Sequence, residues 1–443
     1  MANIPTPTVA SIPNGRLAVL FMVMLVAAAG NTAMQSILPA LGAKLGIADV
    51  WVSLAFSWSA LLWVITAPKW ARQSDKRGRK ALMAVGIIGF VSSMLFCGLT
   101  LWAGLEGWLS AGVTFAFFAL FRSLYGGFGS AAPPAVQAYV AARTEAAERT
   151  KALSLVASSF GLGTVIGPTI APYLILPVLG LSGPLFVFAG IGVAVIIALR
   201  LVLPDDTPRF EVRGQVSAYP AAGGGGQIVD SDGDGEMDQD DRSSTERIGW
   251  FDPRVRGWNI AGLVGGHAQA MTMGVIGFLI LDRLNLRQTP DLAAEPTGHV
   301  LWVGAIATLL AQWALIPLLS LKPRTAVISG CAVGGMGALL VGLGDTLPTI
   351  STGFAFAMLG FGLFRPGFTA GASLAVPRPL QGQVAGQTAS INGAAYIVAP
   401  AIGVLLYNWH AELTFLLITT LCLGMSIWGW RGLKEAPVRN PEQ

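Results

Sequence analysis

Residues 71–80 read ARQSDKRGRK, a short segment with five basic residues and one acid between two long apolar runs. Lys and Arg cross a bilayer only at high cost and collect in cytoplasmic loops. This segment is therefore predicted to be a cytoplasmic loop that joins two membrane-spanning helices. It also places Asp75 beside a turn glycine, Gly78, and close to Arg79 and Lys80, which is more charge than a topology signal needs.

The composition is that of a polytopic membrane protein. Of the 443 residues, 53% are hydrophobic and 12% are charged, and the mean hydropathy is +0.62. Ordinary soluble proteins carry about 25% charged residues. The 55 glycines suit helices that pack closely in lipid. The three cysteines, Cys97, Cys331 and Cys422, lie in apolar segments and are expected to be buried core residues.

Twelve apolar segments are long enough for the roughly 20 residues that a helix needs to span a bilayer. They are predicted near 17–40, 50–70, 81–103, 110–138, 152–178, 184–203, 256–281, 300–320, 325–344, 349–372, 384–406 and 411–431. With both termini in the cytoplasm, most loop Lys and Arg fall on that side, and only Lys44, Arg283 and Arg287 lie outside. This asymmetry predicts cytoplasmic termini.

The chain divides into two halves that resemble each other. LFR at 120–122 recurs at 363–365, and SSFGLGTVIGPTIAPYL at 158–174 recurs as SINGAAYIVAPAIGVLL at 390–406. Such internal repeats are typical of transporters with a binding site near the membrane midplane. The predicted domains are an N-terminal six-helix bundle (1–203), a cytoplasmic acidic and glycine-rich linker (204–253) and a C-terminal six-helix bundle (254–443).

The linker contains a segment with the spacing of a calcium-binding loop. DSDGDGEMDQDD, at 230–241, places acids at the ligand positions of that loop, namely Asp230, Asp232, Asp234, Asp238 and Asp241. The flanking segments GGGG and RSSTER do not resemble the paired helices of such a site. We therefore interpret the segment as an acidic disordered linker, and we predict no metal site and no cofactor.

Three motifs resemble the major facilitator superfamily, and within it the twelve-helix drug:proton antiporters of the tetracycline-efflux type. ARQSDKRGRK is similar to the loop between helices 2 and 3, usually written GxLADRxGRK, although Ala71 and Gln73 depart from it. LFRSLYGGFGSA (120–131) matches the helix 4 pattern through Arg122. GTVIGPTIAP (163–172) matches the helix 5 antiporter pattern through Gly163, Gly167 and Pro168.

The resemblance implies an all-α polytopic fold with two pseudo-symmetric six-helix bundles that work by alternating access. It implies that Asp75, Gly78, Arg79 and Lys80 form a gating latch, in which Arg79 pairs with Asp75 between helices 2 and 3. It also implies that the helix 5 motif closes the outward leak path.

Two basic residues, Arg122 and Arg365, lie deep within predicted spans. A cation inside a membrane protein is functional by default, and Arg stays protonated, so neither can itself carry a proton. No Asp or Glu falls at membrane depth. Two interpretations remain open: coupling uses an acid at the cavity mouth together with Arg122, or the cargo is neutral or anionic.

Further polar residues occupy plausible cavity positions. His267 is the one histidine at depth and a candidate protonation site, with a neutral, hydrogen-bonded histidine as the alternative. The remaining candidates are Asn31, Gln35, Gln137, Gln269, Asn392 and Tyr396. Each alone can serve as interhelical contact, but together they indicate a polar cavity.

These observations predict a proton-coupled exporter of small organic molecules (drug or metabolite efflux). The alternative is an exporter or importer of an anionic metabolite or siderophore-like compound on the same fold, and a membrane scaffold or sensor is a more distant one. No ATP-binding loop or catalytic triad is present, so we predict no enzyme. The expected partners are a small-molecule substrate, protons and the lipid bilayer, without nucleic acid. We expect a monomer in the bacterial inner (plasma) membrane.

Overall fold

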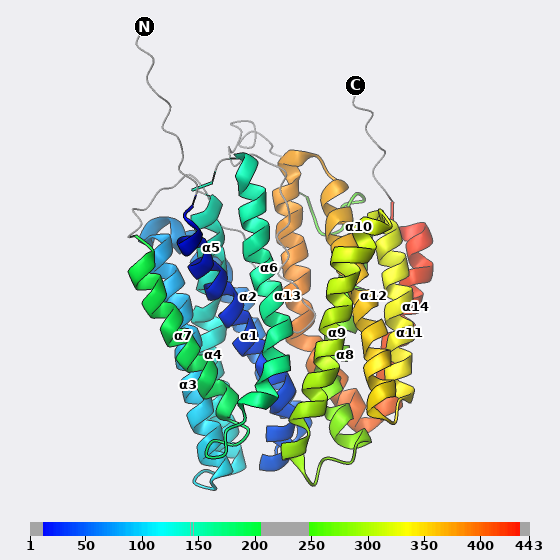
Figure 1. Cartoon of the computed structure of the whole chain (residues 1–443). Coiled ribbons are helices and arrows are strands. Elements are labelled where there is room, and N and C mark those ends of the chain that lie inside the picture. The colour runs from blue at the N-terminus through cyan, green and yellow to red at the C-terminus, as the bar shows by residue number, and fades with distance from the viewer. Residues whose placement is uncertain (1–11, 142, 145, 205–247, 435–443) are drawn as a thin grey trace, which may run out of the picture.

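The protein is described here by a computed structural model, which covers residues 12–141, 143–144, 146–204 and 248–434. Eleven helical segments among these residues are long and apolar enough to cross a membrane, and α6 (Ala146–Ile170) runs beside them as the twelfth (Figure 1). The predicted all-α polytopic fold is confirmed. Most of the predicted linker, including the calcium-loop-like segment, lies outside the described residues.

The first half of the chain forms six spans. The fourth span is α4 and α5, joined by the 3-10 turn Gly129–Ala131, and α6 continues into the turn Ala171–Leu174. Besides α6, the helices of this half are α1 (Asn14–Leu45), α2 (Asp49–Arg77), α3 (Arg79–Leu105), α4 (Ala111–Phe128), α5 (Ala132–Ala141) and α7 (Gly183–Val202).

The second half forms six more spans. Its second span begins at Ala294 rather than at 300, because Pro296 falls in the first turn, where a missing backbone N–H costs nothing. That span is α9 followed by the π-helical turn Ala311–Leu315 and α10. The helices are α8 (Arg256–Arg283), α9 (Ala294–Leu310), α10 (Ile316–Leu318), α11 (Pro323–Leu343), α12 (Leu347–Leu374), α13 (Arg378–Trp409) and α14 (Ala411–Gly432).

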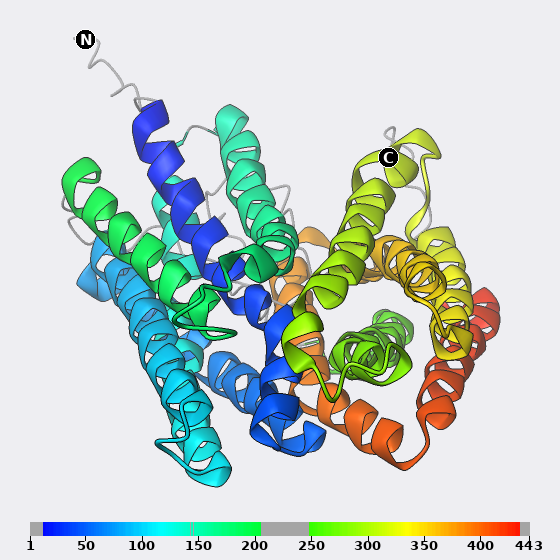
Figure 2. The ribbon, with the colours of Figure 1, turned by 60° about the horizontal axis from the view of Figure 1, so that its bottom comes forward.

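The two halves form two bundles, α1–α7 and α8–α14, which lie side by side (Figure 2). Their internal packing is equivalent: α1 packs on α6, and α8, its counterpart, packs on α13, the counterpart of α6. The start of α1 and the end of α14 lie at one end of the molecule, which we name the terminal end. The other end, where α1 turns into α2 and α8 leads to α9, is named the opposite end.

The bundles touch through α1 with α8, α2 with α13, and α6 with α9. Figure 1 shows α6 and α9 meeting at the opposite end and separating toward the terminal end. The three cysteines are buried in the core, as predicted. Large apolar side chains on the outer faces, such as Leu201 and Ile427, are 81% and 74% exposed, as lipid-facing residues are.

Candidate functional site

The charged segment of the sequence forms the connection between α2 and α3. Gly78 has φ of 88°, a left-handed value that favours glycine, and it allows α3 to begin directly after α2 ends. Lys80 Nζ donates to the carbonyl of Arg200, 3.3 Å away, and to that of Leu203, at the end of α7. Arg79 is buried. The side chain of Asp75 lies outside the described residues, so its pairing with Arg79 stays a prediction.

Arg122, on α4, lies in the interior of the first bundle and is 1% exposed. Its Nη2 donates to Oδ1 of Asn31 on α1 at 2.7 Å. The guanidinium also lies near two rings, with centroids at 5.1 Å for Tyr125 and 5.9 Å for Phe56. An amide oxygen and two aromatic faces are neutral partners that favour the cation without cancelling its charge.

Arg365, on α12, is the counterpart of Arg122 in the second bundle and is 3% exposed. It interacts with the Tyr396 hydroxyl on α13. That contact is not a well-formed hydrogen bond, because the Tyr396 Oη atom and the Nε and Nη1 atoms of Arg365 have no hydrogen-bond partner within the described chain. The two pseudo-equivalent arginines therefore differ in degree: within the described chain, two nitrogens of Arg365 have no hydrogen-bond partner, against one, Nη1, of Arg122.

A small cavity of about 50 Å³ lies between the two bundles, lined by α1, α2, α8 and α13. Two residues predicted as cavity positions, Gln35 and Tyr396, form part of its wall. Sequence reasoning missed Ser53 and Phe56 on α2, which also line it. Because Phe56 contacts Arg122 as well, one wall of the cavity borders the Arg122 site.

The helix 5 motif lies where α6 packs on α1. A Cβ atom on Gly163 would lie 2.4 Å from the Leu25 carbonyl oxygen, and one on Gly167 would lie 2.1 Å from that of Ala29. Only glycine allows this approach. On the other side, the Pro168 carbonyl faces Gly298 of α9 across the boundary between the bundles. The motif therefore lies where three helices meet, at a contact that the bundles share.

The other predicted residues are dispersed. Gln137, Gln269 and Asn392 are buried, on α5, α8 and α13. His267 is only partly buried, and its Nδ1 lies 2.7 Å from the carbonyl oxygen of Leu263. Leu263 and Ile260, on the same face of α8, are 47% and 40% exposed. The structure thus places His267 on an exposed apolar stripe and not in the cavity wall.

Ion pairs join the two bundles at the opposite end. Lys44 contacts Asp291 at 2.7 Å, and Arg287 contacts Asp49, at the start of α2, at 2.7 Å. Arg287 also pairs with Asp282 of its own bundle. Hydrogen bonds from Arg287 to Asp282 and then Asp49 hold the pKa of this guanidinium well above its usual value. We name these two bundle-spanning pairs, Lys44–Asp291 and Arg287–Asp49, the clamp.

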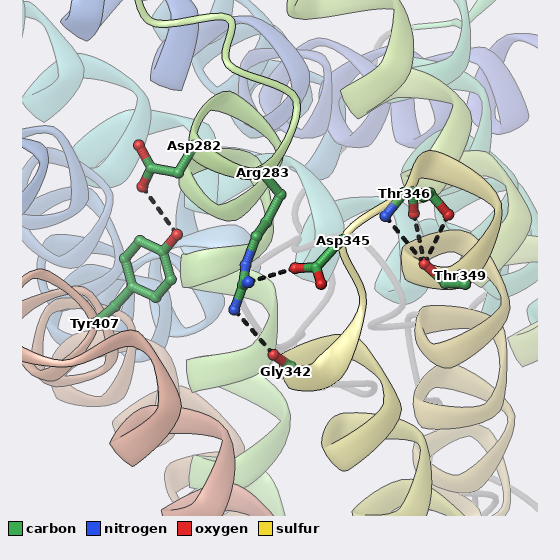
Figure 3. A network of polar contacts seen from close by, with 7 residues as sticks. All are labelled: Asp282, Arg283, Gly342, Asp345, Thr346, Thr349 and Tyr407. Atoms are coloured by element: carbon green, nitrogen blue, oxygen red, sulfur yellow. Dashed lines mark hydrogen bonds and ion pairs between the residues drawn. The ribbon is translucent and has the colours of Figure 1, made fainter.

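Other polar contacts at this end stay within the second bundle (Figure 3). Tyr407 donates to Asp282 at 2.9 Å, and Arg283 donates to Asp345 and to the Gly342 carbonyl. Sequence reasoning did not assign these residues or the clamp to a site. The available signal was that the three basic residues of this end, Lys44, Arg283 and Arg287, lie near helix ends that also carry acids.

Two six-span bundles with a mostly apolar cavity between them, bordered by a few polar side chains, have the architecture of a membrane transporter. The sequence profile of the Major Facilitator Superfamily matches residues 20–400. The chain belongs to this superfamily, and it is a transporter of small molecules embedded in a membrane, not an enzyme.

Known relatives and structures agree with this assignment. Multidrug resistance protein 2 of Bacillus subtilis is 24% identical over 365 residues, which cover 81% of this chain and 80% of the relative. The staphyloferrin B transporter of Staphylococcus aureus is 26% identical over 208 residues, 45% of this chain and 46% of that protein. The crystal structure of a D-xylose–proton symporter superposes with a TM-score of 0.69 at 13% identity, covering 95% of this chain and 98% of that one.

Proposed function

We propose that the protein exports small organic molecules from bacteria in exchange for protons, by alternating access. The observation that carries this proposal is a cavity between two bundles that, among the described residues, ion pairs join at the opposite end. The resemblance of the helix 5 motif to the antiporter pattern supports the export direction, and the motif lies against both α1 and α9. The similarity to a multidrug resistance protein agrees with a drug or metabolite as cargo.

The proposed orientation has both termini in the cytoplasm of a bacterial plasma membrane. The terminal end carries most of the basic residues of the loops, among them Arg16, Lys80 and Lys322, whereas the opposite end carries Lys44, Arg283 and Arg287. In this orientation, the clamp closes the external side and the cavity belongs to an inward-facing state. We propose that the protein acts as a monomer, without nucleic acid, and that the 71–80 latch closes the cytoplasmic side in the other state.

Protons act at the clamp in this proposal. Within the described helices, every Asp and Glu lies within four residues of a helix end, so no carboxylate is available at membrane depth. Asp49 is 5% exposed and accepts both of its hydrogen bonds from Arg287. A proton on Asp49 removes its charge and weakens this contact, which links protonation from outside to opening of the external side.

A second candidate cargo is an anionic metabolite or a siderophore-like compound, exported or imported. Two buried arginines without a carboxylate at membrane depth favour it. The similarity to a staphyloferrin B transporter also supports this candidate.

The test is proton release from inverted membrane vesicles that carry the protein, followed with a quenched ΔpH dye. A panel of cationic, neutral and carboxylate-bearing compounds is added to the wild type and to Arg122→Ala. Dequenching by neutral or anionic compounds that is lost in Arg122→Ala supports proton-coupled export. Dequenching by cationic compounds alone contradicts the cargo assignment. No dequenching with any compound, together with uptake of the cargo by whole cells, would identify an importer.

The scaffold or sensor alternative is tested by deleting 221–245. An exporter keeps its substrate-driven proton release after the deletion, because the cavity and the clamp lie elsewhere in the chain. Loss of all function with normal membrane insertion would favour the sensor.

A further inference from the structure

We propose that Arg365 and Tyr396 form a subsite that binds the carboxylate group of an aromatic or otherwise apolar cargo. This inference rests on the proposed transport function and names the substrate class of the same cavity. Three observations support it. The two buried arginines differ in their surroundings, the groups near Arg365 are hydrogen-bond donors, and Tyr396 forms part of the cavity wall.

The two buried arginines are equivalent by sequence repeat but not by surroundings. Arg122 donates to Asn31 at 2.7 Å and lies beside the faces of two aromatic rings. Arg365 is equally buried, and two of its nitrogens, Nε and Nη1, have no hydrogen-bond partner in the part of the chain that the structure describes, whereas of the Arg122 nitrogens this holds for Nη1 alone. A buried charge with unsatisfied donors is costly unless an anion or acceptor completes it. The second bundle therefore holds the guanidinium that is suited to a ligand.

The groups that converge with Arg365 are hydrogen-bond donors. The Tyr396 hydroxyl is buried close to Arg365, and its oxygen has no hydrogen-bond partner in the described structure. Guanidinium N–H groups only donate, and a phenol beside a cation is best used as a donor as well. A carboxylate, with two oxygens and several lone pairs, matches such a set and binds arginine more strongly than a neutral group does.

Tyr396 connects this pair to the cavity, because its side chain forms part of the cavity wall. Most of the remaining wall is apolar, with Val52, Phe56, Met273 and Phe278 among its residues. Ser53 adds one buried hydroxyl whose oxygen has no hydrogen-bond partner among the described residues. A ligand with one carboxylate and an apolar ring system meets both surfaces, as small-molecule sites usually do.

Charge selectivity follows from the same geometry. No Asp or Glu of the described helices lies deeper than four residues from a helix end. A cationic cargo would meet Arg122 and Arg365 without a counter-charge, and like charges at short range in a low-dielectric site repel strongly. Anionic cargo is therefore preferred over cationic cargo of the same shape.

The test measures the binding of a matched pair of radiolabelled probes to purified full-length protein in lipid nanodiscs. The probes are 2-naphthoate and its neutral analogue 2-naphthamide, with Kd determined by equilibrium dialysis. The variants are Arg365→Gln and Tyr396→Phe, and the control is Arg256→Gln, which removes an exposed arginine at the start of α8. Thermal unfolding confirms that each variant is folded. Tyr396→Phe removes one oxygen only, and it keeps the test decisive where Arg365→Gln does not fold.

In the wild type, naphthoate is expected to bind at least about 10-fold more tightly than naphthamide, because a charged hydrogen-bonded pair replaces a neutral one. Arg365→Gln should raise the Kd of naphthoate by about 10- to 100-fold, and Tyr396→Phe should raise it by about 3- to 10-fold. The Kd of naphthamide should stay unchanged in both variants, and Arg256→Gln should match the wild type.

Equal binding of the two probes, or a preference for naphthoate that survives both Arg365→Gln and Tyr396→Phe, overturns the subsite. Vesicle measurements separate this failure from failure of the proposed function. Proton release driven by neutral compounds, together with equal binding of the probes, removes the carboxylate subsite but leaves proton-coupled export in place. Absence of proton release with every compound contradicts the export function itself.

Discussion

Arg122 and Arg365 show how far one residue type can be interpreted from sequence. The LFR repeat predicts that both lie at depth, and both are buried. The sequence also named Asn31 as a polar candidate, but it could not pair Asn31 with Arg122, because the two residues are 91 positions apart. Such pairing depends on the rotation and the vertical offset of two helices. For the same reason the sequence could not show that His267 lies on an exposed stripe of α8.

Asn31→Leu should reduce cargo-driven proton release by about 10- to 100-fold, because a hydrogen bond to a charged group contributes roughly 1.5–3 kcal/mol. Its loss leaves the Arg122 guanidinium buried with one partner fewer. The measurement is initial dequenching rate in inverted vesicles at equal protein content. Asn14→Leu makes the same substitution at the exposed start of the same helix and should have no effect. Equal rates for the two variants would contradict a role for the Asn31–Arg122 pair.

At the scale of the element, the packing of α6 on α1 explains the helix 5 motif. The small residues predicted a close approach to another helix, but not which helix. The structure identifies α1 through Gly163 and Gly167 and adds a second contact, from Pro168 to Gly298 of α9. The contact across the bundles could not be predicted, because it depends on how two separately folded units dock.

Gly167→Ala should destabilise the protein by about 1–3 kcal/mol, the usual cost of forcing extra volume into a packed interface. The new Cβ would lie 2.1 Å from a backbone carbonyl, which cannot move aside like a flexible side chain. The measurement is the apparent Tm of purified protein in detergent. Gly190→Ala on α7, where no atom lies within 4 Å of the new Cβ, is the control and should be neutral or slightly stabilising. Equal Tm values for both variants would contradict the assigned contact.

At the scale of the whole molecule, charge and hydropathy predicted the twelve spans, and the repeat predicted two bundles. They did not predict which side is closed. The clamp residues come from two short segments, 44–49 and 287–291, one in each bundle, and their pairing exists only in one relative placement of the bundles. Sequence reasoning could see acids near helix ends, such as Asp49 and Asp282, but not that Arg287 bridges them.

Breaking the clamp should make the cavity more accessible from the opposite end. In a variant without native cysteines, Ser53→Cys places a thiol in the cavity wall, where a membrane-impermeant maleimide added at that side can report access. Arg287→Gln should raise the labelling rate by roughly 2- to 5-fold, because a half-exposed ion pair contributes at most about 1 kcal/mol. Arg283→Gln breaks the pair with Asp345 inside one bundle and should leave the rate unchanged. Equal acceleration by both would show that the effect is not specific to the clamp.

The central claim is that the two bundles move against each other and that the clamp holds the opposite end closed. The most direct measurement is the distance distribution between spin labels at Trp108 and Leu343, exposed positions on different bundles at that end, by double electron–electron resonance. We expect a short and a long population, with the long one enriched by Arg287→Gln and unchanged by Arg283→Gln. A single distance, identical in the wild type and in Arg287→Gln and unmoved by pH or 2-naphthoate, would contradict it.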